Sequence, residues 1–130
     1  MTHVARDRGM LYYKGADYFF IAKNAFPWHS TPDFVIARDG YDNFFVAHAI
    51  RNNVSVIDAT TTLLAVHQTD IEGNLAGGTN TVDRRFNKKL IGRFKYSRGH
   101  TRLAPYVTIV ARDESDNTTS VAVQKRKLKR

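Results

Sequence analysis

The period of the apolar residues changes in the middle of the chain, and this change constrains the fold most. Between residues 41 and 53 the apolar stripe follows the spacing of an amphipathic helix: Tyr41, Phe44, Phe45, His48 and Ala49. Short β-branched runs follow at residues 54–58 and 63–67. Helix and strand patterns alternating in this way predict an α/β fold with a mixed sheet and flanking helices.

The segment before this helix predicts a strand, a loop and a turn. Residues 17–23 combine aromatic and β-branched side chains, which is typical of a strand buried on both faces. Residues 24–32 contain two prolines around Trp28 and His29 and predict a structured loop. Residues 38–40 predict a turn with Asp39 as the N-cap of the helix.

The last third of the chain predicts a helix and a β-hairpin. A helix is expected over residues 82–94, with an apolar stripe formed by Phe86, Leu90 and Phe94. Residues 106–112 and 119–124 alternate in polarity and predict two strands, with residues 113–117 as the hairpin loop.

The positive charge of the chain is concentrated in this last third. The whole chain of 130 residues has a net charge of +8, but residues 1–83 carry −3 and residues 84–130 carry +11. We therefore expect one domain over residues 1–130, with a core region at 1–83, a basic helix and hairpin at 84–124 and a basic tail at 125–130. An acidic partner would bind through residues 84–130.

Several classes of protein are excluded by what the sequence lacks. Without cysteine there is no disulfide framework, no cysteine-ligated zinc and no thiolate catalysis. No apolar stretch is long enough for a membrane span, no signal segment is expected, and no compartment is indicated. Phosphate-loop, dinucleotide-binding, serine-hydrolase and zinc-protease motifs are absent as well.

Two residues are the candidates for chemistry. Asp42 lies in the first turn of the predicted helix, where it either caps the helix or acts as a general base. His67 ends an apolar strand-like run, and ligand and metal sites of α/β folds gather at strand ends. His48 is expected to be a packed core histidine, and Asp17 and Asp58 to fix loops by hydrogen bonds.

Ordered sequence blocks resemble a family of glycosyltransferase-like proteins of the GT-A, nucleotide-diphospho-sugar transferase type. The blocks agree in order and spacing over residues 15–68, and Asn87, Leu90 and Gly92 match a later block more loosely. The matching stretches are Gly15-Ala-Asp-Tyr-Phe-Phe, Phe26-Pro, Pro32-Asp-Phe-Val-Ile-Ala-Arg-Asp-Gly-Tyr-Asp-Asn-Phe-Phe, Val56-Ile-Asp-Ala-Thr and Ala65-Val-His-Gln.

The resemblance implies roles for particular residues. Asp42 would deprotonate the acceptor hydroxyl, and His67 would help to hold a divalent metal, Mn²⁺ or Mg²⁺. The substrate-binding residues would be Asp17, Trp28, Tyr41 and Asn43. The ligands would be a nucleotide-sugar and an acceptor that is a glycan or a small molecule.

The sequence also departs from the family pattern. Family members carry a nucleotide-binding half before the Asp-Tyr-Phe block, whereas this chain begins just before that block. Ala37 replaces a glycine, Tyr41 and Phe44 replace tryptophans, and Thr69-Asp70 follows His67-Gln68 where a further His and Tyr are expected. The expectation is a glycosyltransferase-like domain that is inactive alone, either an acceptor-side part of a larger transferase or a degenerate descendant. In the first case the open sheet edge favours a homodimer or poor solubility. The alternatives are a basic module that binds nucleic acid or another polyanion, and a non-catalytic scaffold.

Overall fold

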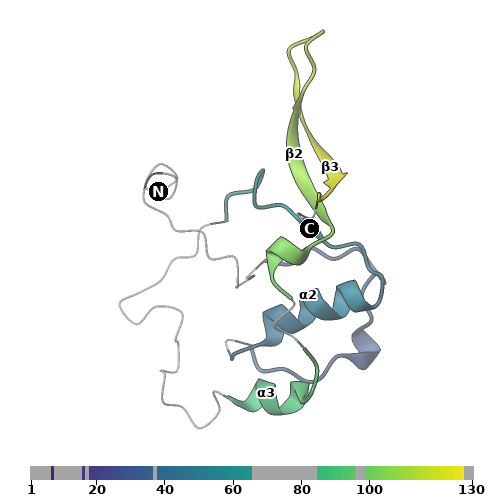
Figure 1. Cartoon of the computed structure of the whole chain (residues 1–130), viewed down its shortest axis with the longest axis vertical. Helices are drawn as coiled ribbons and strands as arrows, with labels where there is room; N and C mark the ends of the chain where they lie inside the picture. Colours follow the sequence, from purple (N-terminus) through teal and green to yellow (C-terminus); the bar gives the residue numbers. More distant parts are fainter. Residues whose placement is uncertain are drawn as a thin grey trace.

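The chain forms a mixed α/β structure in which a small sheet lies beside two helices (Figure 1). It is a computed structural model that describes residues 7, 16, 18–36, 38–65, 85–95 and 99–127. The elements are the 3-10 turn η1 (Trp28–Ser30), α2 (Tyr41–Arg51), β1 (Ile57–Asp58), α3 (Phe86–Ile91), the 3-10 turn η4 (Thr101–Leu103), β2 (Tyr106–Arg112) and β3 (Thr119–Lys125). The predicted α/β class with a mixed sheet and flanking helices is confirmed at this level.

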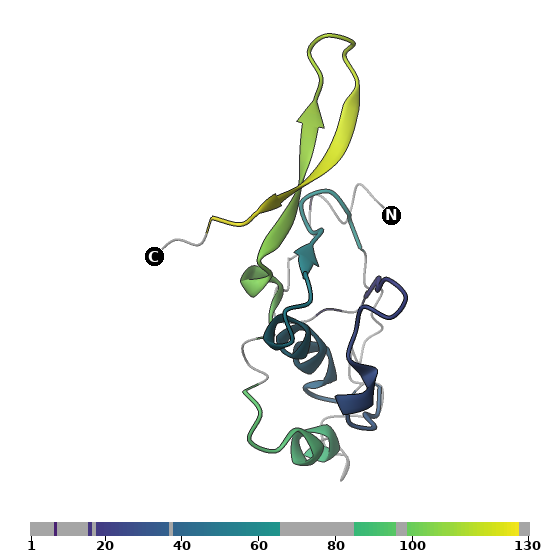
Figure 2. The same ribbon diagram turned by 90° about the vertical axis from the view of Figure 1, so that its right-hand side faces the viewer.

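The sheet has the order β1-β2-β3, with β1 parallel and β3 antiparallel to β2. The hairpin register runs from Tyr106 opposite Lys125 to Arg112 opposite Thr119, which confirms the predicted strands to within one residue. In the hairpin loop the backbone N–H of Ser115 donates to Asp113 Oδ1 at 2.9 Å. Figures 1 and 2 both show this hairpin projecting away from the helices.

The core is built around α2, which confirms the predicted helix. Its buried face consists of Phe44, Val46, Ala47, His48 and Ala49. The N-cap position is Gly40 rather than the predicted Asp39, because the chain enters the helix with φ 97°, a left-handed conformation that glycine adopts without strain. In both views α3 lies on the side of α2 away from the hairpin (Figure 2).

The predicted buried strand over residues 17–23 is not found. Residues 18–23 form no regular element, and Phe20 is 88% exposed. The Phe19 ring instead packs edge-on against Phe45 of α2, with ring centroids 5.8 Å apart. An aromatic run has the composition of a strand, but here it packs across a helix, and Asp17 itself lies outside the described residues.

The strands predicted on either side of the threonine run are also shorter than expected. Only Ile57–Asp58 of residues 54–58 pairs with β2, because Val54 N still bonds Ala49 O at the end of α2. Residues 63–65 form no strand, and the rest of the predicted strand, with His67, lies outside the described residues.

α3 is shorter than the helix predicted over residues 82–94. In the described part of that range, it covers only Phe86–Ile91. Its buried residues are Asn87 and Ile91, whereas Phe86 and Leu90 of the predicted stripe are exposed. The side chain of Asn87 hydrogen-bonds the backbone of Val35, so the face of α3 that carries Asn87 is buried. The other face, with Phe86 and Leu90, is exposed as a result. No helix in the described part of the chain is long and apolar enough to cross a membrane.

Candidate functional site

The first turn of α2 carries the predicted base and two of the predicted substrate-binding residues. Tyr41, Asp42 and Asn43 follow Gly40 directly, so they lie at the positive end of an 11-residue helix. Asp42 Oδ2 accepts a hydrogen bond from the backbone N–H of Ala16 at 3.3 Å. The carboxylate is therefore half-buried in a position that favours negative charge.

Asn43 connects this turn to a distant part of the chain. Its Nδ2 donates to the carbonyl oxygen of Gly99 at 3.0 Å. Gly99 itself lies so close to the helix that a Cβ atom there would stand 1.6 Å from the carbonyl oxygen of Asn43. This contact fixes the backbone of the turn that presents Asp42, so Asn43 has a positioning role here whatever it binds.

Aromatic rings link the other predicted residues to this turn. Phe45 is the centre of the cluster, and the Tyr41 ring lies 6.1 Å from it. Trp28, in η1, lies 5.9 Å from the same ring and 4.6 Å from the ring of Phe26. Trp28 is 54% exposed, so about half of its surface is accessible to solvent. The structure thus joins Trp28 and Tyr41 through Phe45, whereas Asp17 and His67 lie outside the described residues.

A second polar cluster surrounds His48, on the next two turns of α2. Its side chain is 8% exposed and stacks on Phe44 with ring centroids 4.9 Å apart, which confirms the expected packed histidine. Ser30 Oγ lies 3.0 Å from His48 Nε2, and Asn52 Nδ2 lies 3.4 Å from His48 Nδ1. Sequence patterns gave no signal for this cluster, because its partners lie 18 residues before and four residues after the histidine.

The hydrogen bonds of the cluster favour one tautomer of His48, with the proton on Nε2. Ser30 Oγ donates to the Pro27 carbonyl at 3.0 Å, so its oxygen accepts from Nε2–H of the ring. Asn52 Nδ2 donates to the His48 carbonyl at 2.8 Å, which identifies the amide nitrogen and presents its second hydrogen to Nδ1. In this tautomer Nε2–H donates to Ser30 Oγ, which differs from the arrangement in which a histidine accepts the proton of a nucleophilic serine.

Burial lowers the pKa of His48 below 6.5, and the nearby charges of His29 and Arg51 lower it further. The carbonyl of Pro27 acts in the opposite direction. The imidazole is therefore neutral at neutral pH, as the hydrogen bonds require.

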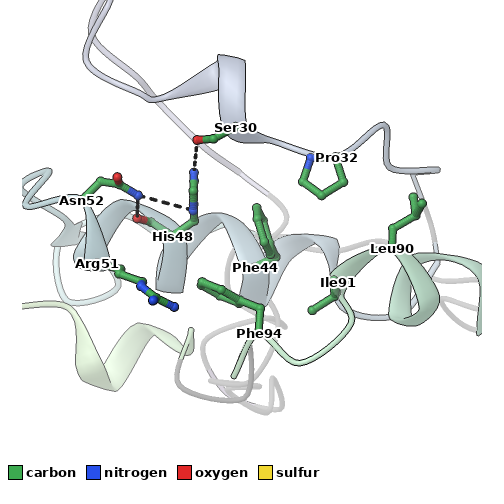
Figure 3. A pocket seen from close by; sticks show the side chains of 9 residues that line it. All are labelled: Ser30, Pro32, Phe44, His48, Arg51, Asn52, Leu90, Ile91 and Phe94. Atoms are coloured by element: carbon green, nitrogen blue, oxygen red, sulfur yellow. Dashed lines mark hydrogen bonds between the residues drawn. The ribbon is translucent and has the colours of Figure 1, made fainter.

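A shallow pocket of about 460 Å³ lies beside this cluster (Figure 3). Its walls come from η1, α2 and the segment around α3, and the Arg51 guanidinium lies over the Phe94 ring at 5.5 Å. The lining residues are Ser30, Pro32, Phe44, His48, Arg51, Asn52, Leu90, Ile91 and Phe94. Ser30 and Asn52 each hydrogen-bond His48, so the polar groups of this pocket have partners within the protein. They therefore indicate no particular class of ligand.

Asp58 fixes a loop, as the sequence indicates. Its Oδ2 lies 2.6 Å from Arg126 Nη2, and its Oδ1 accepts from the backbone N–H of Thr60 at 3.0 Å. Arg126 also donates from Nε to the Ala104 carbonyl at 3.1 Å. The pair joins the end of β1 to the residue that follows β3, and no catalytic role is needed to explain it.

The described residues do not form a metal site. Within them, no three His, Asp or Glu side chains gather as ligands. The predicted ligand His67 lies outside the described part of the chain, so the divalent metal stays a prediction. Comparison of the chain with protein-family models, curated proteins and solved structures found no match.

Proposed function

We propose that this chain is the acceptor-side part of a GT-A-type glycosyltransferase that uses a nucleotide-diphospho-sugar, with Asp42 as its general base. The observation that carries the proposal is the placement of the Asp42 carboxylate. It lies half-buried at the start of α2, bonded by Ala16 N–H, on a turn held by Gly99. A base needs this kind of fixed carboxylate, ionised and at the edge of the fold.

The reaction would proceed by displacement at the anomeric carbon of the donor sugar. Asp42 would accept the proton of an acceptor hydroxyl as the hydroxyl oxygen forms the new glycosidic bond. The bond between the anomeric carbon and the diphosphate oxygen would break, and the nucleoside diphosphate would leave with the electron pair. Trp28 and Tyr41 would offer aromatic surfaces to the acceptor. No step assigned here to the described residues depends on a metal.

The contacts between the resembling blocks support this proposal. Asn87, from the late block, bonds the backbone of Val35 and Arg38 in the block that leads to Asp42. Ala16, from the first block, bonds Asp42 itself. Segments up to 52 residues apart therefore meet around one helix start, as parts of a single functional unit would.

The open side of β1 supports the finer assignment to part of a larger α/β fold. β1 is a parallel strand at the edge of the described sheet, and the Ile57 side chain is exposed. Leu63 and Leu64, which follow it, are exposed as well. Parallel strands are normally covered on both faces, so further strands and helices of a nucleotide-binding half would suit this edge.

The test is transfer of a labelled sugar from UDP- and GDP-sugars to a panel of saccharide acceptors, combined with acceptor binding by ligand-observed NMR. We expect Asp42→Asn to lower transfer by about 10²-fold or more while leaving acceptor binding nearly unchanged. Asp39→Asn is the matched control, since Asp39 is a half-exposed carboxylate that pairs with Lys88 at 2.9 Å. Wild-type transfer by Asp42→Asn would remove Asp42 as the base, and failure to bind any nucleotide-sugar or saccharide would overturn the proposal.

The alternative of a polyanion-binding module has less support. In both views α3 lies at the end of the molecule away from the hairpin loop, whereas the segment after β3 lies at the base of the hairpin (Figures 1 and 2). Lys88 pairs with Asp39, and Arg126 pairs with Asp58. The net positive charge is therefore divided between separate regions, whereas nucleic-acid binding favours one continuous basic face.

A further inference from the structure

Within the described sheet, β3 is paired on one side only, and its outer edge is seven residues long. The ends of the hairpin show which residues face outward: Asp113 N bonds Thr118 O, and Arg126 N bonds Pro105 O. Bonded pairs in an antiparallel ladder recur every second residue, so the even-numbered residues of β3 bond β2. The odd-numbered residues present their N–H and C=O groups at the outer edge: Thr119, Val121, Val123 and Lys125.

An apolar stripe accompanies this open edge. Val110 of β2 stands opposite Val121 of β3, and Val123 is two residues further along the same face. All three side chains are more than half exposed, at 60%, 62% and 54%. Proline, bulges and charged side chains usually protect such edges, whereas β3 contains no proline and its one charged residue, Lys125, stands at its end.

We propose that β3 pairs antiparallel with β3 of a second copy of this chain, about a two-fold axis at Ala122. This register uses all seven residues of the strand and places Val121 opposite Val123 of the second copy. Both residues direct their backbone groups outward, so the hydrogen bonds that the register requires are available. The valine stripes of the two hairpins would then join across the axis.

Charge complementarity identifies a second copy as the occupant. The hairpin loop is acidic, with Asp113, Glu114 and Asp116, whereas the residues at the other end of β3 are basic, with Lys125 and Lys127. Antiparallel pairing about Ala122 places Lys127 of one copy beside Asn117 of the other, next to the acidic loop. Opposite charges thus meet at both ends of the paired strands, and they would meet twice because of the symmetry.

The projection of the hairpin makes this pairing accessible. Both views show β2 and β3 extending beyond the helices, with the hairpin loop far from α3 (Figures 1 and 2). An isolated two-stranded hairpin is marginally stable in water, so a four-stranded arrangement would stabilise it. The proposal is independent of glycosyl transfer, because β3 carries none of the residues assigned to that reaction.

Cysteine cross-linking tests the register directly, since the chain has no cysteine of its own. In the proposed dimer Ala122 faces itself as a non-bonded pair, with Cα atoms about 4.5 Å apart, which suits a disulfide. We expect Ala122→Cys to form a covalent dimer under mild oxidation. Ser120→Cys is the matched control on the same face, because its partner would be Gln124 and the two introduced cysteines would be about 13 Å apart.

Sedimentation velocity of the unmodified chain and of two Val121 variants provides the second measurement. Val121→Pro removes an outward N–H without removing a bond to β2, and we expect it to weaken dimerisation about tenfold or more. Val121→Thr keeps the N–H and the β-branched shape, and it should dimerise like the unmodified chain. A monomer at every concentration, equal cross-linking of both cysteine variants, or an undiminished dimer in Val121→Pro would overturn the proposal.

Discussion

The side chain of Asn87 hydrogen-bonds both the N–H and the C=O of Val35, which lies 52 residues earlier in the chain. Its Oδ1 accepts from Val35 N at 3.0 Å, and its Nδ2 donates to Val35 O at 2.8 Å. A third bond, at 3.2 Å, reaches the carbonyl of Arg38. One fully buried amide therefore satisfies the backbone of the segment that leads into the Asp42 turn.

Replacing Asn87 should destabilise the protein strongly. Asn87→Ala removes three hydrogen bonds between a fully buried side chain and the backbone of Val35 and Arg38, and we expect a loss of about 2–4 kcal/mol in the free energy of unfolding. Lys88→Ala is the control, since Lys88 forms an exposed ion pair that contributes about 0–1 kcal/mol. Urea denaturation followed by circular dichroism measures both, and equal losses would contradict the anchoring role of Asn87.

Gly99 should not tolerate even a methyl group. A Cβ atom there would lie 1.6 Å from Asn43 O and 2.9 Å from Ala47 N, and backbone atoms within a helix cannot move aside. We expect Gly99→Ala to cost more than about 3 kcal/mol or to prevent folding. Gly92→Ala meets nothing within 4 Å but lies at φ 58° and ψ −123°, a conformation that favours glycine, so it should cost about 1–3 kcal/mol. Thermal unfolding compares the two, and the reverse order would show that the packing at Asn43 is looser than described.

The stability of the protein should fall as the pH drops below 6.5. Burial lowers the pKa of His48 from 6.5 in the folded state, so the unfolded chain binds the proton more readily. The contribution of neutral His48 is complete above pH 6.5 and is lost as the pH falls toward the lower pKa of the folded state. Urea midpoints at about pH 7.5 and about pH 5.5 should differ more for the unmodified chain than for His48→Gln.

The other four histidines are present in both of these proteins, so the comparison isolates the replacement of His48. Hydrogen bonds from Ser115 and Thr118 lower the pKa of Asp113 and Asp116, so these carboxylates stay ionised over this range. The same pH dependence in His48→Gln would assign the effect to other groups.

Local patterns predicted the elements whose stability depends on near neighbours. The helical period of residues 41–53 became α2, and alternation around an Asp-rich and Asn-containing loop became the β2–β3 hairpin. The packed state of His48 and the loop-fixing role of Asp58 also followed from their positions. For the helix and the hairpin, the residues that decide the structure lie within a few positions of one another, and the contact of Asp58 with Thr60 is equally local.

Distant partners explain what the sequence did not predict. An aromatic run such as residues 18–23 suits either a strand or a segment packed on a helix. Here the run packs on α2, through the contact between Phe19 and the distant Phe45. The buried face of α3 follows a polar residue, Asn87, which a hydrophobic pattern cannot select. At the candidate site the helix start and Asp42 were predictable, but the Ala16 and Gly99 contacts were not.

The Asp58–Arg126 pair should hold the short strand β1 in the sheet. The side chain of Asp58 is 10% exposed and that of Arg126 is 23% exposed, so either residue alone would leave a poorly solvated charge. We expect Asp58→Asn and Arg126→Met each to cost about 1–3 kcal/mol, and the double variant to cost less than their sum. A double-mutant cycle of urea denaturation measures this coupling, and simple additivity would show that the two residues act separately.

The single tryptophan, Trp28, lies in the helical layer, so its fluorescence reports on that layer alone. Trp28 packs against Phe26 and Phe45 beside α2, whereas the hairpin contains no tryptophan. Its fluorescence should therefore follow the loss of the helical layer, while the far-ultraviolet strand signal follows β2 and β3. Because the hairpin extends away from that layer, the two signals can separate on unfolding, and coincident transitions would show that the projecting strands and the helical layer unfold as one cooperative unit.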